Sequence, residues 1–151
     1  TGSEIWNNTE PTTSLVTVDN NGNSNDPSGA SFIAYCFANC EGYIKAGSYV
    51  GNGSTDGTFV YTGFKPAWVM VKNTSATEAW VVADNGRSPF NVVDEILKPN
   101  NSNAEATGST YYCDFLSNGF KPRTTWEGWN QTNTFVYLAF AENPFQFATA
   151  R

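Results

Sequence analysis

Short apolar runs, separated at close intervals by Gly, Asn, Pro and Ser, recur along the whole of this 151-residue chain. The runs have the length of strands and are rich in aromatic and β-branched residues, which suit a half-buried pleated sheet. Leu is scarce and Met occurs once, so strong helix formers are few. The pattern predicts an all-β fold.

The Gly, Asn, Pro and Ser residues between the apolar runs set the bounds of the expected strands. They cover residues 14–18, 31–38, 41–51, 58–61, 68–72, 79–83, 111–116, 120–123 and 134–141. At most one short helix is expected, over residues 92–97, ended by Pro99. Many short strands at this spacing are typical of a single β-sandwich or jelly roll.

Two of these runs are similar to each other. Residues 31–38 (SFIAYCFA) and 134–141 (TFVYLAFA) are both almost continuously apolar, which indicates strands that are covered on both faces. We therefore expect two equivalent long strands in the sandwich interior, as neighbours at the centre of a sheet. Residues 31–151 then form the sandwich domain, and residues 1–30 form an N-terminal strand and polar loop that continues from an upstream region.

The number and distribution of charged residues limit the partners that this chain can bind. Only 15% of residues are charged, the net charge is −6, and the eight basic residues are scattered. Nucleic-acid binding needs clustered Lys and Arg, so no nucleic-acid partner is expected. No apolar run reaches the 18 or more residues of a membrane span, so no membrane insertion is expected. The Asn-, Thr- and Gly-rich surface is of a kind common in secreted and viral surface proteins.

Histidine is absent, which removes the usual general base and the commonest metal ligand. The three cysteines do not have zinc spacing, and we predict no metal site and no cofactor. Hydrolysis would need a pair of carboxylates, and the spacing of the acidic residues offers no such pair. The sequence predicts no catalytic residue and no enzyme. The acidic candidates are Asp94, Glu95, Asp114, Glu127 and Glu142.

Four residues of a polar, glycine-containing loop are the candidate contact site: Trp126, Glu127, Trp129 and Asn130. Exposed aromatic rings flanked by polar groups stack on sugar rings or anchor protein partners. The alternative is that the two rings fold back to cap the sandwich or pack between subunits. Trp68 and Trp80 lie within apolar runs and are expected in the core.

Much of the chain resembles a family of domains of unassigned function from tailed bacteriophages, especially marine ones, near the ends of tail or virion structural proteins. The resemblance covers residues 31–151. The first thirty residues of the chain show no pattern that is specific to this family. It is carried by FIAYCF at 32–37, EGY at 41–43, GSYVGNGSTDG at 47–57, FVYTGFKPAWVMVK at 59–72, RSPFN at 87–91, DFLSNGFK at 114–121 and AFAENPF at 139–145.

The resemblance implies a virion location and a concanavalin-like or jelly-roll sandwich, and it carries over no catalytic residues. Cys40 and Cys113 stand where the family has other residues. A disulfide between them would be specific to this chain, and buried or free thiols are the alternative.

Three functions follow in order of preference. The first is a non-enzymatic virion structural domain in a tail fibre, tail tip or surface decoration. It would act with other virion proteins and with itself, as a trimer or higher homo-oligomer, and attach to the host surface. The second is a lectin-like carbohydrate-binding module for a host surface glycan. The third is a glycan hydrolase, against which the missing histidine and the unpaired carboxylates count.

Overall fold

The computed structural model describes residues 9–20, 22, 25–26 and 28–144. The chain divides into two compact units, Thr1–Cys36 and Phe37–Arg151. Phe145 and the residues after it, part of the expected sandwich domain and of the phage resemblance, lie outside the described residues.

The first unit contains no strand or helix among its described residues. The strands expected at 14–18 and 31–38 are therefore wrong. In the described part of the chain, the backbone of residues 31–38 makes no hydrogen bond, and Ile33 and Tyr35 are 79% and 78% exposed. Apolarity alone does not make a strand, because a strand exists only where a second segment supplies its hydrogen-bond partners.

The second unit holds all the strands of the described residues. These are β1 (Ile44–Val50), β2 (Val60–Tyr61), β3 (Pro66–Asn73), β4 (Val81–Asp84), β5 (Ile96–Leu97), β6 (Cys113–Leu116), β7 (Gly119–Pro122) and β8 (Thr134–Ala141). A three-residue 3-10 turn, Ser109–Tyr111, is the only helical element in the described part.

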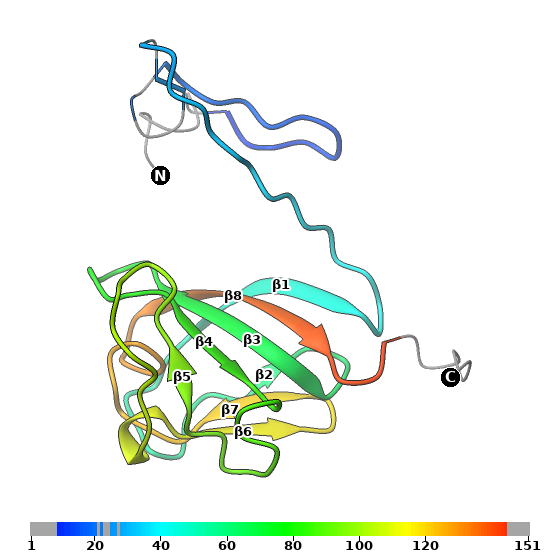
Figure 1. The fold of residues 1–151 in the computed structure, drawn as a ribbon. Helices are drawn as coiled ribbons and strands as arrows, with labels where there is room; N and C mark the ends of the chain where they lie inside the picture. The colour runs from blue at the N-terminus through cyan, green and yellow to red at the C-terminus, as the bar shows by residue number, and fades with distance from the viewer. Residues whose placement is uncertain (1–8, 21, 23–24, 27, 145–151) are drawn as a thin grey trace. The chain divides into compact units, whose positions relative to one another are not determined.

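The strands form two antiparallel sheets, which Figure 1 shows as two facing layers. The larger sheet has the order β1-β8-β3-β4-β5, and the smaller one has the order β2-β7-β6. The expected all-β sandwich is confirmed. β8, the expected strand at 134–141, lies inside the large sheet between β1 and β3. The strand expected beside it at 31–38 is absent, and β1 and β3 take the neighbouring places.

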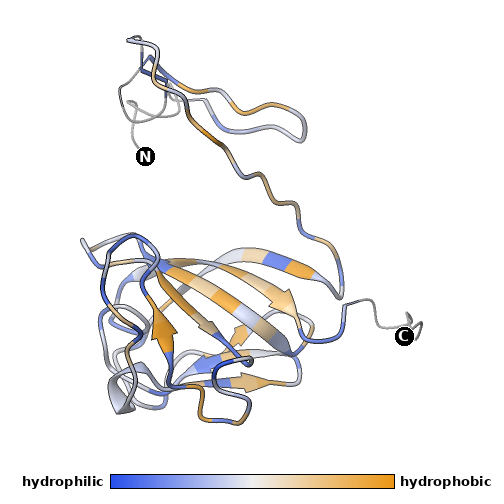
Figure 2. Ribbon diagram, viewed as in Figure 1, coloured by the Kyte–Doolittle hydropathy of each residue, from blue (hydrophilic) through white to orange (hydrophobic). Residues whose placement is uncertain are grey.

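The core lies between the two sheets, because alternate residues of each strand point inward. In the large sheet these include Tyr49, Val69, Val71, Phe135 and Ala139, which all belong to one buried cluster. The small sheet contributes inward residues to the same cluster from β2, β6 and β7. Figure 2 shows the apolar residues gathered along β3, β4, β5 and β8, with polar residues in the loops.

Other local expectations need correction. Residues 92–97 form no helix: Val93 bridges to Cys113 and the stretch ends in β5. Trp68 is only half-buried and Trp80 is 37% exposed, so neither is a core residue. Trp68 points outward because its neighbour Val69 takes the inward position of β3. Phe37, expected in the interior, is 53% exposed.

Candidate functional site

The loop from Thr124 to Asn133 connects β7 to β8 and is fastened to the sandwich by hydrogen bonds. Thr124 Oγ1 accepts from the backbone N–H of Trp126 at 3.0 Å. The backbone oxygen of Trp126 accepts from the N–H groups of Trp129 and Asn130 at 3.1 and 2.9 Å, which closes a tight turn. Asn73 Nδ2, from β3, donates to the backbone oxygen of Glu127 at 2.9 Å. The loop is therefore a structured part of the unit.

Trp129 does not offer its ring to a partner. The residue is 0% exposed and lies in the core cluster, tilted against Phe120 with ring centroids 6.4 Å apart. The buried hydroxyl of Tyr49 donates to its backbone oxygen at 2.6 Å. The expectation of two exposed rings on one platform is wrong for Trp129, and its alternative, a ring folded back to close the sandwich, describes this residue.

Asn130 is also fully buried, and its amide holds a second loop in place. Nδ2 donates to Asn52 Oδ1 at 2.8 Å, to the backbone oxygen of Ser54 at 2.7 Å and to that of Thr124 at 3.1 Å. Oδ1 accepts from the backbone N–H of Asn52 at 3.1 Å. With its hydrogen-bonding capacity used inside the protein, Asn130 is a structural residue that joins the 52–58 and 124–133 loops.

The two remaining predicted residues lie nearer the surface. Glu127 is exposed. Trp126 is half-buried and packs edge-to-face on Tyr111, with ring centroids 5.0 Å apart, and Lys98 Nζ lies 5.2 Å from its ring centroid. Gly128 lies so close to this ring that a Cβ atom there would come within 2.4 Å of it. Much of the Trp126 ring is thus covered by its own chain.

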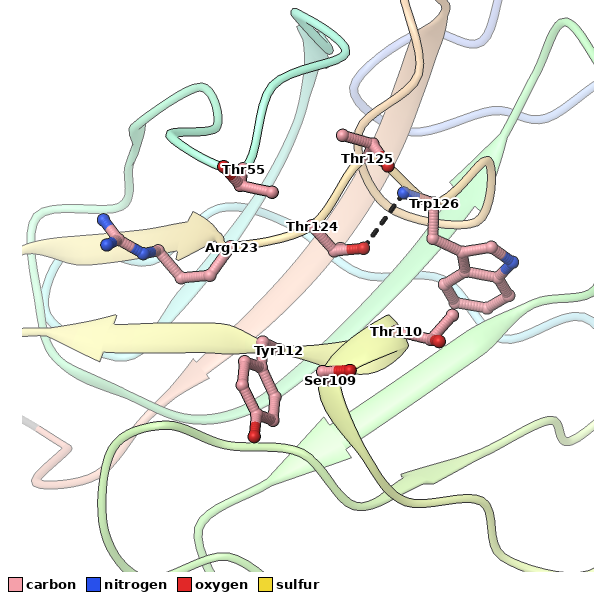
Figure 3. A pocket seen from close by; sticks show the side chains of 8 residues that line it. All are labelled: Thr55, Ser109, Thr110, Tyr112, Arg123, Thr124, Thr125 and Trp126. Atoms are coloured by element: carbon pink, nitrogen blue, oxygen red, sulfur yellow. Dashed lines mark hydrogen bonds between the residues drawn. The ribbon is translucent and has the colours of Figure 1, made fainter.

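An open groove of about 580 Å³ lies beside Trp126 (Figure 3). Its lining is rich in hydroxyl groups and comprises Thr55, Ser109, Thr110, Tyr112, Arg123, Thr124, Thr125 and Trp126. A groove of aromatic rings and hydroxyl groups suits a polar ligand that also has an apolar face, such as a sugar.

The β6–β7 hairpin brings the two halves of this groove together. Its register pairs Cys113 with Pro122, so the residues before β6 lie opposite those after β7. The backbone N–H of Arg123 donates to the oxygen of Tyr112 at 2.7 Å across this junction. Our sequence reading missed Tyr112 and Arg123. The available signal was the two-residue turn Ser117-Asn118, which fixes the register of the hairpin.

The charges beside the groove largely compensate one another. Lys121 Nζ lies 2.6 Å from Asp56 Oδ1, and this hydrogen bond lowers the pKa of the exposed Asp56 carboxyl. Arg123 makes only longer contacts, 3.4 Å to Asp56 and 3.7 Å to Asp114. Two cations face two carboxylates, so the groove has no charge excess that would select an anionic ligand.

The acidic residues that were candidates for a hydrolytic carboxylate pair do not meet in the groove. Glu142 pairs with Lys65 at 3.0 Å, and Asp114 faces Arg123. Asp94 and Glu95 both approach the buried Ser88 hydroxyl, at 3.5 and 3.3 Å. Among the described residues that line the groove there is no carboxylate.

The cysteines form no disulfide among the described residues. Cys40 and Cys36 are exposed, whereas Cys113 is fully buried in the core, where burial raises the pKa of its thiol well above its usual range. Of the two alternatives, the structure has free thiols and no Cys40–Cys113 disulfide, because one sulfur lies between the sheets and the other at the surface.

A second feature is the outward face of the large sheet. The register places Ala46, Leu138, Met70, Val82 and Leu97 in one row across all five strands. Ile44, Phe140, Trp68 and Asp84 form the adjacent row. The solvent side of an antiparallel sheet is usually polar, whereas this face is mostly apolar.

Aromatic side chains surround this face. Phe140 is met edge-on by Phe37, Tyr43 and Trp68, with centroid distances of 6.0, 6.1 and 5.5 Å. An apolar hollow of about 260 Å³ opens beside them, lined by Phe37, Ala46, Met70, Trp80, Val136, Tyr137 and Leu138.

The described residues were compared with the requirements of a membrane-spanning helix and of a metal cluster, and they meet neither. That part of the chain has no helix long and apolar enough to cross a bilayer. It also has no cluster of three or more His, Cys, Asp or Glu residues placed to hold a metal ion.

In a comparison with known families, residues 1–144 match the family described as "Domain of unknown function (DUF7483)". No curated protein and no solved structure shows significant similarity to the chain.

Proposed function

The chain belongs to the DUF7483 family of domains of unknown function, and we propose that it is a non-enzymatic structural domain of a bacteriophage virion. It acts by association, with itself and with other virion proteins in a tail fibre, tail tip or surface decoration. The resemblance of residues 31–151 to tail and virion proteins of tailed phages supports the virion location.

One observation carries the associative role: large apolar side chains lie at the surface where a solitary domain would place polar ones. Phe32, Ile33 and Tyr35 are exposed in the first unit, and Phe37, Trp80 and Val136 are exposed in the second. Scattered exposed apolar residues are ordinary, but contiguous apolar surface marks sites of interaction.

Electron microscopy tests this function with two samples. Purified chain should form discrete oligomers, and a gold-labelled antibody against it should mark purified phage particles at a fixed position. A capsid-only or tail-only position would identify the virion part. Particles that lack the chain would contradict the proposal.

A carbohydrate-binding role is the second candidate, and the groove beside Trp126 favours it. Its hydroxyl groups and two aromatic rings match an uncharged saccharide better than an acidic one, because the adjacent charges compensate one another. Titration of the chain with neutral oligosaccharides should then show saturable binding that Arg123→Ala weakens, while Lys45→Ala, outside the groove, leaves it unchanged. No saturable binding would remove this candidate.

A further inference from the structure

The outward face of the five-stranded sheet is mostly apolar. We propose that it is where two copies of this chain pack together, each presenting the same face to the other. This inference rests on the proposed associative function and names the surface and the partner.

The charges on the outward face favour a second copy of this chain as its partner. Of the outward positions of the five strands, only Lys72 and Asp84 are charged. Lys72 Nζ donates to the backbone oxygens of Asn73 and Ala76, and Asp84 pairs with Arg87. The face therefore presents no unpaired charge to which an oppositely charged partner would be matched. Two such faces can meet without like charges opposing each other, although the chain carries a net charge of −6.

The shape of the outward face also favours a second copy as the partner. Phe37 and Trp80 stand half-exposed at the hollow over Ala46 and Leu138. In a twofold contact each residue pair occurs twice, so one ring from each copy can enter the hollow of the other. Aromatic side chains seated in pockets are the usual energetic centres of protein interfaces.

The available area suits a weak pair. β1, β3 and β8 have seven or eight residues, whereas β4 has four and β5 has two. At about 4.8 Å between strands and about 3.3 Å per residue, the face covers about 450 Å² per copy. Two copies would bury about 900 Å² in total, which is the size of a weak, reversible contact. We therefore expect a reversible pair that larger assemblies can use as one of their contacts.

Three lysine substitutions test this surface by sedimentation velocity over a concentration series. Val136 lies on β8 at the hollow and is 37% exposed, so Val136→Lys places one charge on each copy where the faces meet. Tyr61→Lys, on β2 of the small sheet, and Leu15→Lys, in the first unit, are matched controls at exposed apolar positions. Circular dichroism and Trp fluorescence verify that each variant is folded, and Val136→Thr serves in its place if the lysine variant is not.

We expect the unaltered chain to form pairs, and Val136→Lys to raise the dissociation constant about 100-fold or more, because like charges would face each other. Both controls should associate as the unaltered chain does. The inference is overturned if the unaltered chain stays monomeric, or if a control variant loses association while Val136→Lys retains it. A monomeric chain that is still found in virions would end this inference and leave the virion role standing.

Discussion

At the scale of single residues, the main finding is the different placement of two tryptophans three positions apart. Trp129 is in the core and Trp126 is at its margin. Their sequence context, polar and glycine-containing, is the same for both. What separates them is the turn closed by the oxygen of Trp126, which directs the two side chains differently. Sequence alone could identify the loop, but not which ring fills the space between the sheets.

Replacing Trp129 should therefore destabilise the fold. Trp129→Ala empties a core site and is expected to cost about 3–5 kcal/mol of unfolding free energy. Trp129→Phe should cost much less, because it keeps a ring and removes an indole N–H that has no hydrogen-bond partner in the described part of the chain. Urea titration measures both. Equal losses for the two variants would show that ring packing is not the cause.

Asn130 should matter for the same loop through its hydrogen bonds. Asn130→Ala leaves the Asn52 N–H and the Ser54 and Thr124 oxygens without this partner, and buried polar groups left unpaired cost about 1–3 kcal/mol each. We expect a total loss of about 2–4 kcal/mol. Asn103→Ala, at an exposed asparagine, is the control, and a comparable loss there would contradict the assignment.

The buried thiol gives a pH prediction. Cys113 keeps its proton in the folded state, while the unfolded chain loses it near pH 9.0. Above that pH the unfolded state binds fewer protons, so the unfolding free energy should fall as pH rises, by at most about 1.4 kcal/mol per pH unit for one group. Burial raises the pKa values of Tyr49 and Tyr137 too, which extends the fall above pH 10.0.

Urea titrations at pH 7.5 and 9.5 measure this fall. Cys113→Ala should flatten it, and Cys40→Ala, at an exposed thiol, should not. In the folded protein at neutral pH, iodoacetamide should label Cys36 and Cys40 and leave Cys113 unmodified until unfolding. A Cys113 labelled as fast as Cys40 would refute its burial.

At the scale of secondary structure, the sequence predicted most strands of the second unit and failed in the first. The runs at 41–51, 68–72 and 134–141 overlap β1, β3 and β8, where alternation or apolarity coincides with a partner strand. The equally apolar run at 31–38 has no partner among the described residues. Hydrophobicity can be recognised in a single segment, whereas a sheet forms only where two segments pair through hydrogen bonds.

The β6–β7 hairpin offers a test of close packing between strands. A Cβ at Gly119 would come within 2.1 Å of the backbone oxygen of Val60 in the neighbouring β2. Gly119→Ala must therefore push β2 away from β7, and we expect a lowered thermal midpoint and faster amide exchange at Tyr61. Gly22→Ala meets no atom within 4 Å and is the control. An unchanged midpoint for Gly119→Ala would show that β2 can shift without cost.

At the scale of the whole molecule, the account rests on the large sheet having two apolar faces. One covers the core, and the other, with its aromatic margin, is proposed to meet a second copy. The sequence indicated association through the aromatic content and the family resemblance, but it assigned the contact to the Trp126 loop. The outward face was not visible from the sequence, because only the register of five strands aligns Ala46, Leu138, Met70, Val82 and Leu97 in one row.

Oxidation of Met70 tests the proposed contact most directly. Met70 is the single methionine of the chain and lines the hollow of the outward face. Its conversion to the sulfoxide by dilute peroxide can be followed by mass spectrometry at protein concentrations below and above the association range. The account predicts that oxidation slows as the copies associate, while alkylation of the exposed Cys36 does not. An oxidation rate that is independent of concentration, in a chain shown to associate, would contradict it.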